Sequence, residues 1–136
     1  MSLSAPYSGM DRDPNEQQYI VAEMTAIITH DPTNAQAYFR RGNALSNLHH
    51  YAQATHDLDR AIALEPGNAM AYNNRGIASL CTGDAEAAIG DLCRAIALDP
   101  TFWSAYRHRG IVHDMRGDHD ASFRDYLKAR ELAGGQ

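Results

Sequence analysis

The sequence predicts an all-α fold in which antiparallel helix hairpins stack into a right-handed superhelical solenoid. The first indication is the spacing of Pro32, Pro66 and Pro100, which lie 34 residues apart. Positions related by this period form columns, and a repeat of this length is one unit that buries its apolar face against its neighbours. The columns that agree are Tyr38, Tyr72 and Tyr106; Arg41, Arg75 and Arg109; Gly42, Gly76 and Gly110; Asp57, Asp91 and Asp125; Ala61, Ala95 and Ala129; and Leu64, Leu98 and Leu132.

Each period contains two helical stretches separated by a short break. In the second unit, residues 69–81 are predicted to form a helix, residues 82–84 a turn, and residues 85–98 a second helix. Asp84 can cap the start of the second helix, and Pro100 prevents its continuation. Each unit is therefore predicted to be a helix hairpin.

The glycine of each first helix predicts close packing inside the hairpin. Gly42 and its column mates lack a side chain where the first helix faces the second. The small residues expected to lie opposite these glycines are Ala54, Ala88 and Ser122. A side chain at the glycine position would separate the two helices.

The start of the chain contains half of one further unit. Moving back by one period places a second-helix pattern at residues 15–30, so we expect a capping helix there. Because Pro6, Ser8 and Gly9 stand where its first helix would be, residues 1–13 are expected to form a flexible tail. Residues 14–136 are expected to form a single domain whose three repeats occupy residues 35–68, 69–102 and 103–136.

The last hairpin is expected to leave apolar surface exposed. After it, residues 131–136 contain no further polar helix of the kind that commonly covers a final repeat. Exposed apolar area on a soluble protein usually marks a contact. We therefore expect self-association or docking through four side chains of this hairpin, Met115, Phe123, Tyr126 and Leu127.

These columns resemble those of the tetratricopeptide repeat family over about residues 33–133. The family's aromatic, glycine, alanine and proline positions correspond here to the columns that start at Tyr38, Gly42, Ala54, Ala61 and Pro66. The resemblance implies a non-enzymatic adaptor in which the first helices of successive repeats line a concave surface. In this family, that surface receives an extended peptide or a helix of a partner.

Carried over column by column, the resemblance implies a set of peptide-binding residues on the first helices. Asparagine amides can hold a peptide backbone, and arginine, together with histidine, can bind carboxylates through charge-assisted hydrogen bonds. The apolar members offer contact area, so a peptide or protein with acidic and apolar residues is favoured over a small molecule. The set comprises Gln36, Phe39, Arg40, Asn43, Asn47, Met70, Asn73, Asn74, Ile77, Ser104, Arg107, His108, Ile111 and Asp114.

One specialised form of this surface, the carboxylate clamp, grips the C-terminal carboxylate of a chaperone tail in some relatives. Asn43 and Asn74 stand at its two asparagine positions. Its basic positions are changed, because Phe39 and Ser104 each replace a lysine and His108 replaces an arginine. The sequence therefore disfavours a chaperone tail as the ligand.

A second departure from the family suggests a structural ion pair. The family usually has leucine before the glycine of the first helix, whereas this chain has Arg41, Arg75 and Arg109, each followed sixteen residues later by an aspartate. That separation crosses the turn and returns along the antiparallel helix. We expect a repeated, partly buried arginine–aspartate pair; the alternative is that the three arginines form an anion site.

Composition narrows the remaining classes of function. The net charge of −5 and the pI near 5.7 oppose broad attraction to nucleic acid or anionic membrane. The first residues do not form a signal peptide and no stretch is long and apolar enough for a membrane span, so a cytoplasmic location is expected. Two cysteines, Cys81 and Cys93, do not make a disulfide scaffold or a zinc pattern.

Metal binding and catalysis are both disfavoured. His113 and His119 flank one turn and are candidate ligands, but helix capping and packing explain the residues around them better. No nucleophile–base arrangement and no phosphate-binding glycine loop is present, so neither an enzyme nor a cofactor is expected. The sequence thus predicts a binding module that acts through its concave surface. The alternative is a homo-oligomerisation module that acts through the last hairpin.

Overall fold

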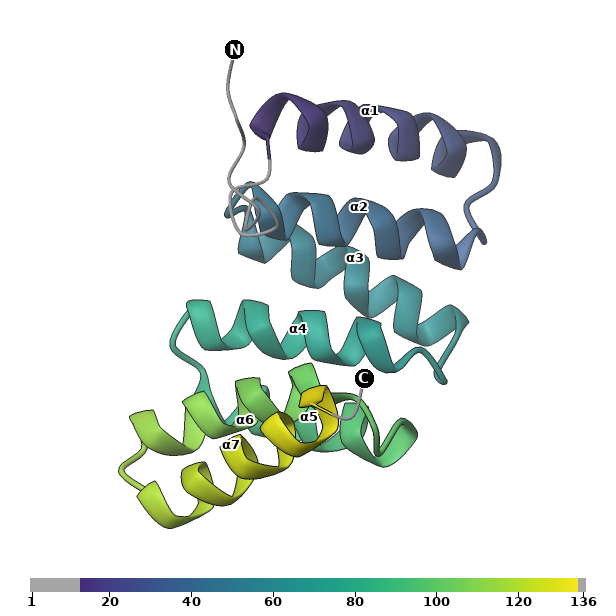
Figure 1. Ribbon diagram of the computed structural model, residues 1–136. Helices are drawn as coiled ribbons and strands as arrows, with labels where there is room; N and C mark the ends of the chain where they lie inside the picture. The colour runs from purple at the N-terminus through teal and green to yellow at the C-terminus, as the bar shows by residue number, and fades with distance from the viewer. Residues whose placement is uncertain (1–12, 135–136) are drawn as a thin grey trace.

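The structure, a computed structural model, describes residues 13–134 and is helical throughout apart from short turns. The helices stack in chain order from α1 at one end to α7 at the other (Figure 1). The predicted all-α solenoid of helix hairpins is confirmed. None of the helices in this range has the length and apolar character that a membrane span requires. In chain order they are α1 (Pro14–His30), α2 (Ala35–Asn47), α3 (Tyr51–Leu64), α4 (Ala69–Cys81), α5 (Ala85–Leu98), α6 (Trp103–Met115) and α7 (His119–Gly134).

The helices alternate between two roles. We call α2, α4 and α6 first helices, because each begins a hairpin, and α1, α3, α5 and α7 second helices. Each second helix packs against the first helix that follows it, so α1 covers α2 in the same way as α3 covers α4. Helix α1 begins one residue before the expected range because Asp13 accepts a hydrogen bond from the amide of Asn15 and proline fits the first turn. Residues 1–12 of the expected tail lie outside the described residues.

The turn inside each hairpin requires a residue with positive φ. Gly83 and Gly117 supply it at φ values of 87° and 81°, where an L side chain would be strained. His49 adopts the same conformation in the first hairpin, with a φ of 64°, and its Nδ1 lies 2.8 Å from the hydroxyl of Tyr51. A non-glycine residue in this conformation costs about 1–2 kcal/mol. The first turn is therefore the least favourable of the three.

The expected arginine–aspartate pairs are confirmed in all three hairpins. In the first, Nε and Nη2 of Arg41 each donate to one carboxylate oxygen of Asp57 at 2.7 Å. Arg75 binds Asp91 at 2.9 and 2.8 Å, and Arg109 binds the aspartate of the third hairpin at 2.8 Å through both nitrogens. The carboxylates are mostly buried, since the side chain of Asp57 is only 4% exposed. Such bidentate pairs fix the geometry as well as the charge.

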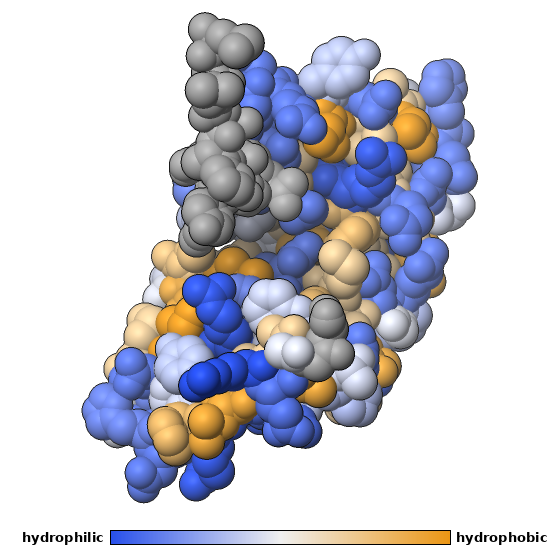
Figure 2. All heavy atoms as spheres, in the orientation of Figure 1, coloured by the Kyte–Doolittle hydropathy of each residue, from blue (hydrophilic) through white to orange (hydrophobic). Residues whose placement is uncertain are grey.

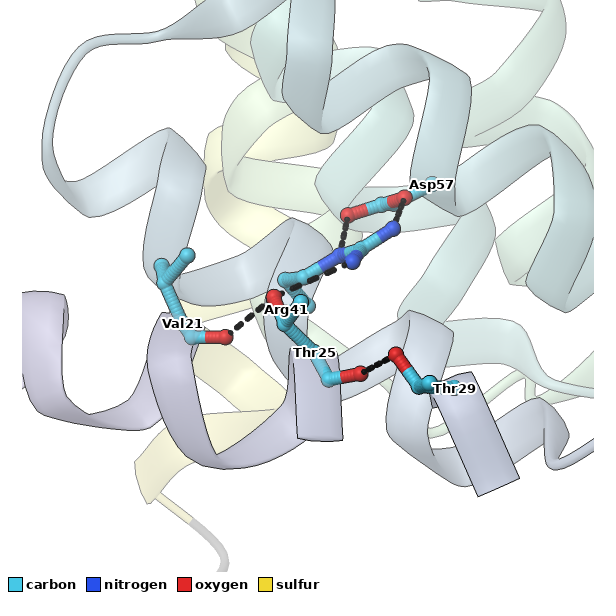
Figure 3. Close-up of polar contacts among 5 residues, drawn as sticks. All are labelled: Val21, Thr25, Thr29, Arg41 and Asp57. Atoms are coloured by element: carbon cyan, nitrogen blue, oxygen red, sulfur yellow. Dashed lines mark hydrogen bonds and ion pairs between the residues drawn. The ribbon is translucent and has the colours of Figure 1, made fainter. Parts of the chain in front are cut away.

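Each arginine also makes a third contact, to the preceding second helix. Nη1 of Arg41 donates to the hydroxyl of Thr25 in α1 at 3.2 Å, as Figure 3 shows. The equivalent atom of Arg75 donates to Asp59 at 2.8 Å, and that of Arg109 lies 3.5 Å from the sulfur of Cys93. One guanidinium therefore links three helices, and we refer to these contacts as the arginine links. The anion site is not favoured, because all three arginines are engaged inside the fold.

Glycine packing inside each hairpin also agrees with expectation. A Cβ atom added to Gly76 would lie 3.0 Å from Cγ of Leu92 and 3.3 Å from the carbonyl oxygen of Ala88. Similar distances occur at the other two glycines of this column, opposite Ala54 and Ser122. Since Leu92 and Ala88 are fully buried, neither can move away without disturbing the core. A fourth glycine, Gly90 in α5, has no heavy atom within 4 Å of its added Cβ.

These two environments give opposite predictions for the same substitution. Gly76→Ala is expected to lower the melting temperature, because overpacking costs about 1–3 kcal/mol and exceeds the roughly 1 kcal/mol gained in helix propensity. Gly90→Ala gains the propensity without the clash and is expected to raise the melting temperature. Thermal unfolding followed by circular dichroism checks both, and an unchanged or raised melting temperature for Gly76→Ala contradicts the packing described above.

Candidate functional site

The first helices form the inner side of the solenoid. Successive first helices contact one another, whereas successive second helices within residues 13–134 do not. Nδ2 of Asn74 donates to Oδ1 of Asn43 at 3.4 Å across α4 and α2, and Nδ1 of His108 lies 3.3 Å from Oδ1 of Asn73 across α6 and α4. Helices that touch in this way lie on the shorter, concave side of the curve. We call the side formed by the columns of Phe39, Arg40 and Asn43 the inner face.

Hollows between the second helices mark the opposite, convex side. A hollow of about 290 Å³ between α1 and α3 is lined by Val21, Thr25, Arg41, Leu45, Gln53, His56 and Asp57. The same place one repeat later, between α3 and α5, holds a hollow of about 360 Å³ that includes Thr55, Asp59 and Arg75. Arginine links form part of both hollows. The convex side is therefore spread open, as expected if the solenoid curves toward its first helices.

Most of the predicted peptide-binding residues are accessible on the inner side. The exposed members are Gln36, Arg40, Met70, Arg107 and Asp114. The partly exposed members are Phe39, Asn43, Asn47, Asn74, Ile77, Ser104, His108 and Ile111. The columns of the inner face, as defined above, thus combine two exposed arginines with three partly exposed apolar side chains, Phe39, Ile77 and Ile111.

One predicted contact residue is placed differently. Asn73 is only 5% exposed, and its amide oxygen lies beside His108 instead of facing solvent. It therefore orients the histidine, and a peptide backbone cannot reach it directly. Asn47 is also engaged, since its amide donates to Gln17 in α1 at 3.0 Å. Of the four asparagines in the predicted set, Asn43 and Asn74 are both partly exposed and contact each other across two first helices.

The charge expected of His108 is not available at neutral pH. Burial lowers the pKa of His108, and the neighbouring positive charge of Arg107 lowers it further. In a neutral imidazole one nitrogen donates a hydrogen bond and the other accepts one, but the ring carries no positive charge that could pair with a carboxylate. The positive charge on the inner face is therefore carried by Arg40 and Arg107, which lie at opposite ends of the first-helix array in α2 and α6.

The face shown in Figure 2 has no single dominant apolar area. Hydrophobic residues form several separate patches, with hydrophilic residues between them. A partner that covers such a surface must satisfy polar groups as well as bury apolar area.

The side chains expected to mediate self-association are exposed on the last hairpin. Met115 and Phe123 are 62% and 63% exposed, and Tyr126 and Leu127 are 38% and 47% exposed. In the first two hairpins the column of Tyr126 contains Leu58 and Leu92, both of which are fully buried. The difference arises because α4 and α6 cover those leucines, whereas α7 has no such cover among the described residues.

The histidines of the last turn face different carboxylates. Nδ1 of His119 lies 2.6 Å from Oδ1 of Asp114, and Nε2 of His113 lies 3.7 Å from Oδ2 of Asp125. Asp118 caps α7 by accepting from the amide of Ala121. Within residues 13–134, no three histidine, cysteine, aspartate or glutamate side chains are grouped as a metal site requires.

Sequence reasoning missed the third contact of each arginine link. Thr25, Asp59 and Cys93 form a column of their own, sixteen residues before the arginines. Their side chains share no chemistry beyond the ability to accept a hydrogen bond, so residue identity gave no signal. Each arginine contacts one residue sixteen positions before it and one sixteen positions after it. This equal spacing was the signal that could have revealed the third contacts.

The lowered pKa of His108 predicts a loss of stability in mild acid. The unfolded histidine binds a proton near pH 6.5, whereas the folded one resists it, so the unfolded state gains protons first as the pH falls. Stability is expected to be constant above that pH and to fall below it, until the folded histidine is also protonated. Melting curves at pH 7.5, 6.5 and 5.5 check this, and the decrease should be smaller for His108→Asn. Equal decreases in both proteins would show that His108 is not responsible.

Comparisons with known proteins agree with this geometry. The tetratricopeptide repeat model matches residues 39–101 and 82–136. No curated protein matches the sequence. Among solved structures, a crystal structure of MamA is 28% identical and has a TM-score of 0.79 over 85% of this chain and 67% of that chain. MamA (41-end) from Desulfovibrio magneticus RS-1 is 25% identical, with a TM-score of 0.82 over 90% of this chain and 69% of that chain.

A third similar structure contains a peptide. The second tetratricopeptide repeat domain of Spaghetti (RPAP3), bound to the HSP90 peptide SRMEEVD, is 27% identical with a TM-score of 0.71. The match covers 76% of this chain and 97% of that domain. The family model spans more than half of the sequence, and the hairpins, the glycine column and the inner face all follow its repeat. The chain belongs to the tetratricopeptide repeat family.

Proposed function

We propose that the protein is a non-enzymatic interaction module whose inner face binds a peptide or a partner segment with acidic and apolar residues. The observation that carries this proposal is the pairing of two exposed arginines, Arg40 and Arg107, with the partly exposed Phe39, Ile77 and Ile111 on one face. Exposed arginines bind carboxylates through charge-assisted hydrogen bonds, and the apolar residues supply buried area. The contacting amides of Asn43 and Asn74 can hold the backbone of the ligand.

The peptide in the Spaghetti structure supports the chemical class of this ligand. SRMEEVD carries three carboxylate side chains beside methionine and valine, so a related domain accepts acidic and apolar residues together. We nevertheless expect this chain to bind a different ligand from the HSP90 peptide. Phe39, Ser104 and the neutral His108 replace the basic residues of a carboxylate clamp. Apolar contact near Phe39 takes the place of one of those charges.

A peptide selection tests the proposal. Phage-displayed peptides are selected on the wild type and on an Arg40→Ala/Asn74→Ala/Arg107→Ala variant. The matched control, Gln53→Ala/Arg94→Ala/Arg124→Ala, removes the same kinds of side chain from exposed positions on second helices. Acidic and apolar peptides are expected to be enriched on the wild type and the control and lost on the inner-face variant. Circular dichroism establishes that all three proteins are folded. Equal enrichment on the inner-face variant contradicts the proposal.

A second candidate is self-association through Met115, Phe123, Tyr126 and Leu127. The observation in its favour is the exposure of these side chains, together with the position of Tyr126, whose column is occupied by the fully buried Leu58 and Leu92 in the other hairpins. Sedimentation velocity over a concentration series separates the candidates. A monomer at every concentration, with peptides enriched on the wild type, favours the inner face. A concentration-dependent dimer without peptide enrichment favours the last hairpin.

A further inference from the structure

A hollow of about 230 Å³ lies at the α6–α7 end of the solenoid, where the inner face stops. It is lined by Trp103, Arg107, Tyr126, Ala129, Arg130 and Ala133. Arg107 belongs both to this hollow and to the inner face, so the two surfaces are continuous. We call this site the end hollow. Its volume is below the range of about 300–1,000 Å³ typical of small-molecule sites, and suits one or two amino-acid side chains.

The residues of the end hollow differ from those of the same columns in the other hairpins. The position of Trp103 is alanine in both, and that of Tyr126 is leucine in both. Arg130 replaces Ile62 and Ile96. The third hairpin thus has two aromatic side chains and one additional cation where the first two have only aliphatic residues.

The two arginines of the end hollow are held without a carboxylate. No ion pair within residues 13–134 engages Arg107 or Arg130, although Arg41, Arg75, Arg109 and Arg116 are all paired. Two positive charges beside one partly apolar hollow repel each other, and an anion placed between them removes that repulsion. Arg40, Arg60, Arg94 and Arg124 are also outside these ion pairs, so what distinguishes Arg107 and Arg130 is that they line one hollow together.

The aromatic walls define the rest of the ligand. Trp103 is 36% exposed and Tyr126 is 38% exposed, so both rings offer apolar surface to a side chain that enters the hollow. Tryptophan, tyrosine and arginine are the residues that most often dominate binding energy at interfaces. A carboxylate alone would leave the rings uncovered, and an apolar side chain alone would leave the arginines without a partner.

We propose that the end hollow anchors an acidic peptide segment, with a leucine-sized side chain between Trp103 and Tyr126 and a neighbouring carboxylate on Arg107 and Arg130. This inference rests on the proposed function of the inner face and adds a second, terminal subsite to it. The ligand is then oriented, because its acidic and apolar anchor lies at the α6 end of the array and the remainder runs toward α2.

The single tryptophan of the chain makes the site directly observable, because Trp103 lines the hollow itself. The probe is acetyl-Glu-Leu-Glu-amide, which contains no fluorophore and is too short to span the inner face from α6 to α2. A saturable change in Trp103 emission is expected on titration. Two control peptides, acetyl-Lys-Leu-Lys-amide and acetyl-Glu-Gly-Glu-amide, are expected to bind with at least tenfold lower affinity. Added salt is expected to weaken binding of the acidic probe.

Variants separate this site from the inner face. Arg130 lies outside the inner face, and Arg130→Gln is expected to weaken binding of the probe at least tenfold. The control Arg124→Gln, on the same helix, is expected to leave this binding unchanged. Arg40→Gln is also expected to bind the probe normally, because Arg40 lies at the other end of the array. Binding that is lost in Arg40→Gln but retained in Arg130→Gln overturns the end hollow and leaves the inner face as the binding site.

Two further outcomes overturn the proposal. One is the absence of a saturable change in emission, or an equal response to the lysine probe. The other is occupancy by a second copy of the chain: the emission then changes on dilution of the protein alone and sedimentation velocity detects a dimer. Because Arg107 belongs to both surfaces, Arg130→Gln is added to the peptide selection to separate the two proposals. Peptides that Arg130→Gln still enriches and the inner-face variant loses bind the inner face alone and overturn the end hollow as their anchor. Peptides that both variants lose, together with a successful titration, support the end hollow.

Discussion

The arginine links join the two helices of each hairpin and connect that hairpin to the second helix before it. In each repeat a guanidinium forms two hydrogen bonds to the aspartate of its own hairpin and one contact to the second helix before it. The planar fork of arginine permits this, since it presents several donors in fixed directions. The hydrogen bonds that Arg75 donates to Asp91 raise the pKa of Arg75, so its guanidinium stays positively charged at neutral pH. The ring of Tyr72 lies beside the same guanidinium, with its centroid 5.6 Å from the central carbon.

This arrangement separates the residues that build the solenoid from those that can vary with function. The tyrosine, arginine, glycine and aspartate columns repeat in all three hairpins and are engaged inside or between them. The inner-face columns do not repeat: that of Phe39 continues as Asn73 and Arg107, and that of Arg40 continues as Asn74 and His108. Binding chemistry therefore lies where the repeats differ. The end hollow follows the same rule, because all of its polar and aromatic residues depart from their columns.

Much of this architecture could be predicted from the sequence because the repeat imposes the same physical requirement three times. The glycine column indicated close packing and the sixteen-residue separation indicated the arginine–aspartate pairs, and both are present. The accessibility of individual asparagines could not be predicted, because Asn73 is buried beside a histidine one repeat away and the amide of Asn47 is engaged by a glutamine in α1. The end hollow was also missed, since Trp103 and Arg130 come together only when α6 and α7 are packed. Their departure from the alanine and isoleucine columns was the available signal.

We expect the arginine links to couple the helices energetically, and a double-mutant cycle on Arg75 and Asp91 measures this coupling. Urea unfolding is measured for the wild type, Arg75→Ala, Asp91→Ala and the double variant. Because each single variant leaves a partly buried charge without its partner, we expect a coupling free energy of about 2–3 kcal/mol between the two residues. A coupling below about 0.5 kcal/mol, the value typical of exposed pairs, would contradict it.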